Sequence, residues 1–244
     1  MGTGPRPPRR DRAAAALPGH RPGPAVRAVR GRGPVLSEGR GAVRTVEGAT
    51  LKLAGDAQDL LFREARSATE FTDDPVTDEQ VAAIYDLVKY GPTSLNQQPL
   101  RMVLVRSPAA RARLLPFLDA RNRTRTEAAP LPIILAADVN FHEKLPVVFP
   151  HAAGLRDALH GDPRRRAEGA RYNALLQIGY LIVGVRAAGL GAGPMIGYDP
   201  AGLDREFFPD GGLRSLLVMN IGVPRPKRHE RLPRLSYDEV VTVL

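Results

Sequence analysis

The stretch that decides the fold is GPTSLNQQP, residues 91–99, a polar segment set between two regular elements. Before it, residues 77–88 carry apolar side chains at helical spacing and open with a capping box, in which Gln80 follows Thr77 by three residues. After it, residues 100–105 are an apolar run of the length of a buried strand. The leading Gly-Pro ends the helix, but turn chemistry does not require the polar side chains that follow. The pattern predicts a helix, a functional loop and a strand.

Regular elements are predicted on both sides of this stretch. They are a short helical segment at about 56–66, a helix at 108–115, a buried strand at 131–137, an irregular stretch at 138–163 with at most one helical turn, a long helix at 165–188, a Gly-rich strand or turn at 190–197, a small helix at 203–207 and a strand at 215–223. The order α-α-β-α-β-loop-α-β-α-β predicts an α+β fold with a mostly apolar sheet. The long helix is unusually apolar, which is typical of a central helix or a subunit interface. Its expected inward residues are Ala174, Leu175, Ile178, Leu181, Ile182 and Val185.

The composition of the 244-residue chain excludes several kinds of site. It contains no cysteine, so disulfides, thiolate nucleophiles and cysteine-ligated metals are ruled out. No His, Asp or Glu cluster has metal-ligand spacing, and there is no Ser/His/Asp pattern or phosphate-binding Walker loop, so no metal site is predicted. No run of about eighteen apolar residues predicts a membrane span, and no apolar signal segment is present. A cytoplasmic location is therefore expected.

The net charge of +9 is concentrated in the first fifty residues. Ten arginines and three acids give +7 there, which leaves +2 for the other residues. Seven prolines and nine glycines, without an aromatic residue, predict a disordered leader over residues 1–55 ahead of a folded domain at 56–244. The leader is interpreted as a dispensable extension, with a targeting segment or a polyanion tether as the alternatives. Because the body is nearly neutral, nucleic-acid binding is not expected.

Four short motifs, in this order, resemble the nitroreductase family from about residue 57 to the C-terminus. They are Glu64-Ala65-Arg66-Ser67, the loop at 91–99, Gly193-Pro194-Met195-Ile196-Gly197 and Pro233-Arg234-Leu235-Ser236. The branch they most resemble is that of the malonic semialdehyde reductases. The resemblance implies a central, mostly antiparallel sheet flanked by helices, in an interlocked homodimer. It also implies one flavin mononucleotide (FMN) at each subunit interface.

The resemblance assigns the flavin phosphate to Arg66, Ser67 and Arg234. Arginine suits this role because its planar fork meets phosphate oxygens with two hydrogen bonds. Many family members carry a second arginine two residues after the serine, where this chain has Thr69. That departure weakens the transfer of phosphate contacts from the wider family.

The resemblance places two further segments along the flavin ring. Asn96 and Gln98 would pair with the pyrimidine edge, and Thr93 and Ser94 would lie near the ribityl chain or the dimer partner. Arg101 follows, where a cation would stabilise the N1–O2 edge of reduced flavin; a surface arginine is the equal alternative. The loop with Pro194, Met195 and Gly197 would stack near the ring and direct a backbone N–H at N5, which requires no particular side chain.

The implied reaction is a ping-pong transfer of hydride from NAD(P)H through FMN to a small electron-poor acceptor, which is a semialdehyde, enone, quinone or nitro compound. Phe71, Phe141 and His142 are candidates for the substrate face. The arginine run at 121–125 is interpreted as a solvated surface, with a contact to a carboxylate or to the phosphates of the nicotinamide cofactor as the alternative. No catalytic acid can be named. The alternatives are an FMN-dependent dehydrogenase that passes electrons to oxygen, a polyanion binder acting through the leader, and a flavin-free scaffold.

Overall fold

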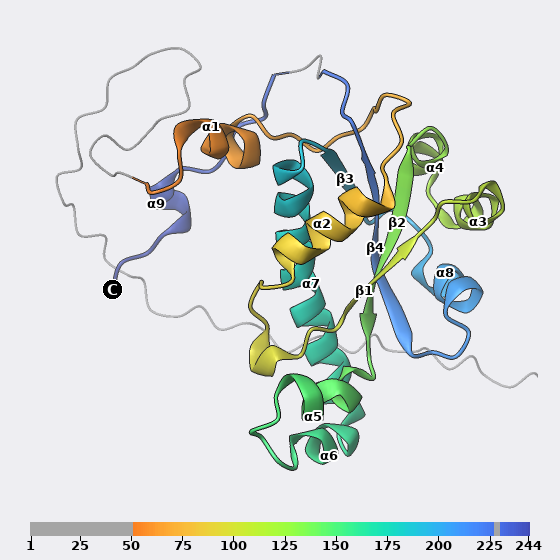
Figure 1. Cartoon of the computed structure of the whole chain (residues 1–244), viewed down its shortest axis with the longest axis vertical. Helices are drawn as coiled ribbons and strands as arrows, with labels where there is room; N and C mark the ends of the chain where they lie inside the picture. The colour runs from red at the N-terminus through yellow and green to blue at the C-terminus, as the bar shows by residue number, and fades with distance from the viewer. Residues whose placement is uncertain (1–50, 227–229) are drawn as a thin grey trace, which may run out of the picture. The chain divides into compact units, whose positions relative to one another are not determined.

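A computed structural model describes residues 51–226 and 230–244 of the chain (Figure 1). The leader predicted at 1–55 lies outside the described residues except for its last five positions, so the proposed domain boundary stays a prediction. The strands are β1 (Leu100–Leu104), β2 (Leu131–Asp138), β3 (Gly191–Met195) and β4 (Leu213–Gly222).

The helices precede, separate and follow these strands. They are α1 (Gly55–Gln58), η1 (Asp59–Arg63), α2 (Asp78–Val88), η2 (Ser94–Asn96), α3 (Pro108–Leu114), η3 (Leu115–Phe117), α4 (Ala120–Glu127), η4 (Phe141–Lys144), α5 (Leu145–Val148), α6 (Leu155–His160), α7 (Pro163–Ala187), α8 (Pro200–Phe207) and α9 (Tyr237–Val240). None of the helices in the described ranges is long and apolar enough to cross a membrane.

The four strands form one sheet in the order β1-β2-β4-β3, and each neighbouring pair is antiparallel. This confirms the predicted α+β fold with a central antiparallel sheet. β2 and β4 occupy the centre, which explains why residues 131–137 are apolar at every position: both faces of these strands are covered. The sheet is therefore the middle layer of three (Figure 1).

Alternate residues of the central strands supply two separate cores. Ile133 of β2 packs with Ile84 of α2 and Leu181 of α7 on one face. Ile134, the next residue, packs on the opposite face with Leu203 of α8. Figure 1 shows the same division, with α2 and α7 on one side of the sheet and α3, α4 and α8 on the other.

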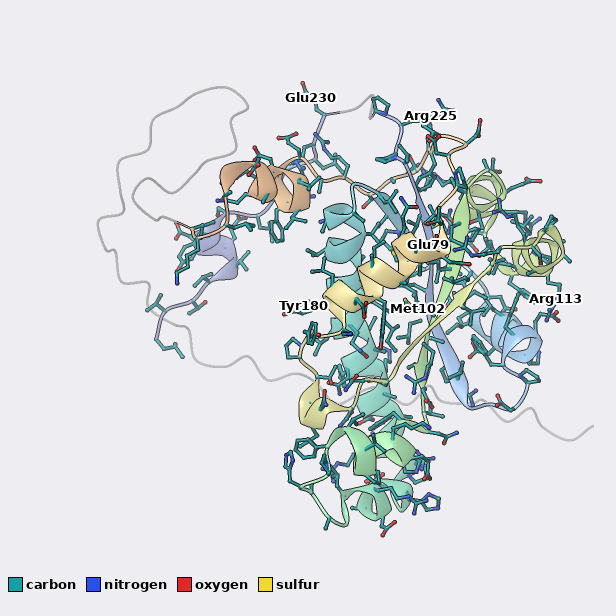
Figure 2. All side chains as sticks on the ribbon, viewed as in Figure 1. Glu79, Met102, Arg113, Tyr180, Arg225 and Glu230 are labelled. Carbon is teal, nitrogen blue, oxygen red and sulfur yellow. The ribbon has the colours of Figure 1, made fainter. Side chains whose placement is uncertain are left out.

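The predicted ends of the helices have clear physical causes. Thr77 and Gln80 form the expected capping box at the start of α2. Beyond the end of α2, Gly91 lies so close to the ring of Tyr180, labelled in Figure 2, that a Cβ there would be 2.8 Å from the ring carbon Cγ. At the end of α7, Gly189 takes a φ of +74°, the left-handed conformation that glycine adopts most readily.

Two details of the prediction were wrong, and one helix was not predicted. Residues 138–163 are not mostly irregular, because η4, α5 and α6 lie within them. Residues 120–127 form the helix α4, which their polar sequence conceals since only Thr126 is fully buried. Leu175 of α7 does not face inward: it is 37% exposed, whereas Ala174 and Ile178 are buried.

Candidate functional site

Two groups of the predicted site residues lie in different parts of the chain. The first group consists of residues 66–69, which run beside β3, and of the side chains that surround them. The amide of Ala68 donates to the carbonyl of Ala192 at 2.9 Å. A Cβ at Gly193 would collide with the carbonyl oxygen of Ala68, so only glycine allows the two backbones to approach this closely.

The first group encloses a small pocket of about 70 Å³. Its lining residues are Ser67, Ala68, Thr69, Arg125, Gly193, Pro194, Met195 and Asn220. Three predicted residues, Ser67, Pro194 and Met195, are therefore brought together as expected. Arg125 and Asn220 are additions that the sequence analysis did not identify as site residues.

Helix α4 completes this group with two side chains on one face. Asn122 donates from Nδ2 to the carbonyl of Gly197 at 2.9 Å, and Arg125 lines the pocket three residues later. Residues three apart on a helix are neighbours, so the spacing within the run at 121–125 was the signal that could have identified this pair. The interpretation of the whole run as a solvated surface was too coarse, because Arg125 is half-buried.

The arginines of the first group have no direct ion-pair partner among the described residues, although the charge of Glu70 acts on Arg125 from nearby. Within the described residues, neither Arg66 nor Arg125 forms a salt bridge, although both are partly buried. Burial, followed by the nearby charge of Arg121, lowers the pKa of Arg125 below its ordinary value. A partly desolvated guanidinium without a carboxylate is suited to an anionic ligand.

The C-terminal arm contacts the first group through a different arginine from the predicted one. Arg231 donates to the carbonyls of Arg63 and Ala65, the latter at 2.8 Å. Arg234 is exposed and donates to the carbonyls of Leu232 and Pro233 in its own segment. Its phosphate role stays a prediction.

The second group is the loop at 93–98, whose backbone is strained. Leu95, Asn96 and Gln98 all have positive φ angles, of 53°, 51° and 46°. Residues other than glycine rarely adopt this conformation, and such strain is concentrated at functional sites. The loop must therefore be held in place by its surroundings.

One buried side chain of α7 holds most of the loop. Asn173 accepts from the amide of Ser94 at 2.7 Å and donates to Oε1 of Gln97 at 2.9 Å. A further contact comes from Asn96, which donates from Nδ2 to the carbonyl of Val148 at 2.7 Å. The sequence analysis missed Asn173 because it is a single polar residue in an apolar helix, without a motif.

Arg101 belongs to the second group, where it is paired. It forms a 2.5 Å salt bridge with Asp138 and donates to the carbonyls of Gln98 and Leu100. Together with Gln98 and Met102, it also lines a larger pocket of about 350 Å³, to which α2, α5 and α7 contribute further residues. Its proposed role at the flavin edge stays a prediction.

The two groups are next to contacts made by different parts of α7. Asn173 and Gln177, in the middle of the helix, bind the loop at 93–98 and the first residue of β1. Arg186, in the last turn, donates to the carbonyl of Leu61, just before the first group. The distance along the helix between Asn173 and its C-terminal end is about 20 Å at 1.5 Å per residue.

The three candidates for the substrate face are buried in this chain. Phe71 packs with Ala68 and Ala129, and Phe141 packs in the core beneath α7. His142 is 1% exposed. None of the three lines either pocket described above, so these side chains have a packing role here and their substrate role stays a prediction.

His142 is part of a cluster that the sequence analysis missed, because His160 and Arg166 follow the adjacent pair His142-Glu143 only 18 and 24 residues after His142. Its Nε2 atom lies 3.2 Å from both Oε1 of Glu143 and Nδ1 of His160. Arg166 approaches the same nitrogen at 3.3 Å, and Arg156 forms a salt bridge with Glu143. Two histidines and a carboxylate are a possible set of metal ligands. Two guanidinium groups already occupy their surroundings, however, and the prediction of no metal site stays untested.

Comparison with known proteins places this geometry in a family. The sequence profile described as the nitroreductase family matches residues 62–223. A protein of Streptomyces coelicolor that carries the name NADH dehydrogenase/NAD(P)H nitroreductase is 57% identical over 196 residues, which are 80% of this chain and all of that protein.

Solved structures show the same fold at low sequence identity. A nitroreductase of Exiguobacterium sibiricum, solved in complex with FMN, is 18% identical with a TM-score of 0.66, covering 79% of this chain and 99% of its own. An NAD(P)H:FMN oxidoreductase of Staphylococcus epidermidis is 18% identical with a TM-score of 0.67, covering 80% and 98%.

Proposed function

The chain belongs to the nitroreductase family, and from this we propose that it is an FMN-dependent NAD(P)H oxidoreductase. The proposed acceptor is a small electron-poor molecule: a semialdehyde, enone, quinone or nitro compound. The observation that carries the proposal is the first group, where Arg125, without a direct salt bridge in the described residues, lines a pocket beside Ser67 at which two backbone segments approach closely.

The residues of the first group fit FMN. Arg66, Arg125 and the hydroxyl of Ser67 offer the donors that a phosphate or the polar edge of a flavin requires. At Gly193 and Gly197 neighbouring groups occupy the place of a side chain: a Cβ at 193 would collide with the carbonyl oxygen of Ala68, and one at 197 with Oδ2 of Asp119. The backbone of this segment is therefore held by close contacts that only glycine allows.

We further propose that each flavin site is assembled from two copies of the chain. The first group supplies cations and the second supplies the amides of Asn96 and Gln98, but the body of α7 separates them within one chain. A two-fold axis across α7 would place the N-terminal half of one helix beside the C-terminal half of its partner. The loop at 93–98 of one copy would then meet residues 66–69 of the other.

The exposed side of α7 supports the same arrangement. Tyr172, Leu176 and Tyr180 are 65%, 55% and 46% exposed and recur at helical spacing. Such a row of large apolar side chains is typical of a face that another subunit covers. A second copy is the occupant that would also complete the site.

In this arrangement the protein binds and orients the reactants. When bound, FMN would take hydride from NAD(P)H and pass it to the acceptor in two half-reactions. Arg66 and Ser67 would hold the phosphate, Arg125 would face the ring from α4, and the Pro194–Gly197 backbone would lie along one face. Asn96 and Gln98 of the partner copy would offer donors and acceptors to the pyrimidine edge.

The test is an anaerobic absorbance spectrum of the full-length protein, before and after addition of NADH or NADPH. We expect a visible flavin band that bleaches with one of the two nucleotides and returns when an acceptor is added. The four acceptor classes are then compared by the rate of return. A protein that neither carries nor takes up FMN would overturn the proposal, and a flavin that NAD(P)H does not bleach would overturn the direction of the reaction.

A further inference from the structure

Asn220 interrupts the apolar pattern of the central strand β4. Its neighbours two and one residues before it, Val218 and Met219, are completely buried, and Ile221 after it is 2% exposed. By alternation, position 220 lies on the same face as Val218, which packs in the core between the sheet, α3 and α8. An amide therefore stands where the strand calls for an apolar side chain, and such departures occur mainly at functional positions.

Only one end of this amide has a hydrogen-bond partner. Nδ2 of Asn220 donates to Oγ1 of Thr126 at 3.1 Å, and Thr126 is completely buried in the last turn of α4. The other end, Oδ1, is buried without a partner. Since buried polar groups are nearly always satisfied, an unpartnered amide end in a residue only 2% exposed calls for a ligand.

The unpartnered residue lines the pocket of the first group. It shares that pocket with Ser67, Arg125 and Pro194, which we have assigned to FMN. Its strand neighbour is Gly193, whose lack of a side chain lets the backbone of Ala68, another residue of the pocket lining, approach closely. The pocket is thus lined by the guanidinium of Arg125, the hydroxyl of Ser67 and a buried amide with one free end.

We propose that the free amide end of Asn220 hydrogen-bonds the bound flavin, and that Thr126 is a positioning residue that orients this amide. The inference rests on the proposed function, because it names a further contact of the same cofactor site. Because Oδ1 accepts hydrogen bonds, the partners that a flavin offers it are donors: the ribityl hydroxyls and the N3–H of the ring. Thr126 connects this contact to Arg125, its neighbour in α4.

The proposal predicts opposite effects on folding and on binding. Replacing both members of the pair with apolar groups of similar shape, in the double variant Thr126→Val/Asn220→Leu, removes an unsatisfied buried group from the flavin-free protein. Its melting temperature without FMN should equal or exceed that of the wild type. Its affinity for FMN should fall about three- to tenfold, the value of one net hydrogen bond. A purely structural pair would give the reverse result.

The experiment uses full-length protein freed of flavin by dialysis and titrated with FMN, with flavin fluorescence and the visible absorption band as readouts. Ser215→Ala is the matched control, because Ser215 is a second buried polar residue of β4 that does not line the pocket. The control should bind FMN like the wild type. Wild-type affinity and an unshifted flavin band in the double variant would overturn the inference, as would a lower melting temperature without FMN. Failure of the wild type to bind FMN would instead overturn the proposed function.

Discussion

The two groups of candidate site residues differ in how they are built. The group at 66–69 is cationic and depends on close contact between backbones, with glycine at 193 to allow it. The loop at 93–98 is rich in amides, and three of its residues other than glycine are held in left-handed conformations by contacts from α7 and α5. One group offers charge without an acidic partner, and the other offers paired donors and acceptors.

This difference teaches that neither group is a complete flavin site. A flavin has a dianionic end and a neutral, hydrogen-bonding ring, so it needs both kinds of surface. Asn173 in the middle of α7 binds the loop at 93–98, whereas Arg186 in its last turn binds Leu61, just before the other group; our proposal of two half-sites that meet between copies of the chain rests on this separation.

The largest expected effect tests this division directly. Arg66→Ala should weaken FMN binding about ten- to a hundredfold, since a hydrogen bond to a charged group is removed. Asn96→Gly should also weaken it, while keeping the left-handed backbone that glycine tolerates. When the two variants are co-expressed with different tags, a mixed dimer holds one site in which both residues are intact. About a quarter of the wild-type FMN content and activity should therefore return.

Co-expression of two differently tagged Arg66→Ala chains is the control and should restore nothing. If each site lay within one chain, every chain of the mixed dimer would carry a defect. A mixture as inactive as its parents, with mixed dimers present, would contradict the division into half-sites.

The next prediction concerns only the group at 66–69, where two backbone segments are in close contact. Gly193→Ala puts a Cβ against the carbonyl of Ala68, where only backbone could give way. We expect the free energy of unfolding to fall by about 1–3 kcal/mol, as in other overpacked sites, together with weaker FMN binding. Gly161→Ala is the control, because its Cβ would meet its nearest neighbour at an ordinary 3.6 Å. Urea titration measures the free energy of unfolding of both variants. If Gly193→Ala were as stable as Gly161→Ala, the close approach of the two backbones would be refuted.

A smaller effect is expected for the loop at 93–98, the strained half of the proposed site. Asn173→Leu leaves the amide of Ser94 without its acceptor and Gln97 without its donor, at a cost of about 1–3 kcal/mol for the buried groups. Hydrogen exchange should quicken in the peptide at 93–98 and stay unchanged at 66–69. Gln177→Leu, which removes the single bond to the amide of Leu100, is the control and should spare the loop. Faster exchange in both peptides would show that the halves are coupled within one chain.

Sequence patterns predicted the fold better than the site, for physical reasons. Caps, glycines and apolar runs are local, so α2, β2 and the end of α7 could be placed from the chain alone. Arg125 and Asn220 could not be assigned to the site from the sequence. They line one pocket only because the fold brings α4 and β4 next to β3 and residues 67–69. The pair formed by Asn173 and Ser94 joins residues 79 positions apart, a separation that no local pattern reveals.

The smallest expected effect uses pH to separate the halves. Burial, followed by the charge of Arg166, lowers the pKa of His142 below its ordinary value of 6.5. The folded protein therefore favours neutral His142, and its contribution to stability is present above pH 6.5 and is lost as the pH falls through the lowered pKa. His142 lies in η4, directly before α5, whose Val148 carbonyl holds Asn96 of the strained loop.

Acidification should thus loosen the strained half first. The test compares about pH 7.5 with about pH 5.5, which lie on either side of the usual histidine pKa. The free energy of unfolding, measured by urea titration, should fall more between these values for the wild type than for His142→Gln. Exposed His151, in the same segment, supplies the control His151→Gln, which should behave like the wild type. If acidification increased hydrogen exchange more in the peptide at 93–98 than in the peptide at 66–69, the loop would be shown to depend on pH separately from the other group. If His142→Gln retained the full pH dependence of the wild type, other groups would be responsible and the loop would have no pH-sensitive support.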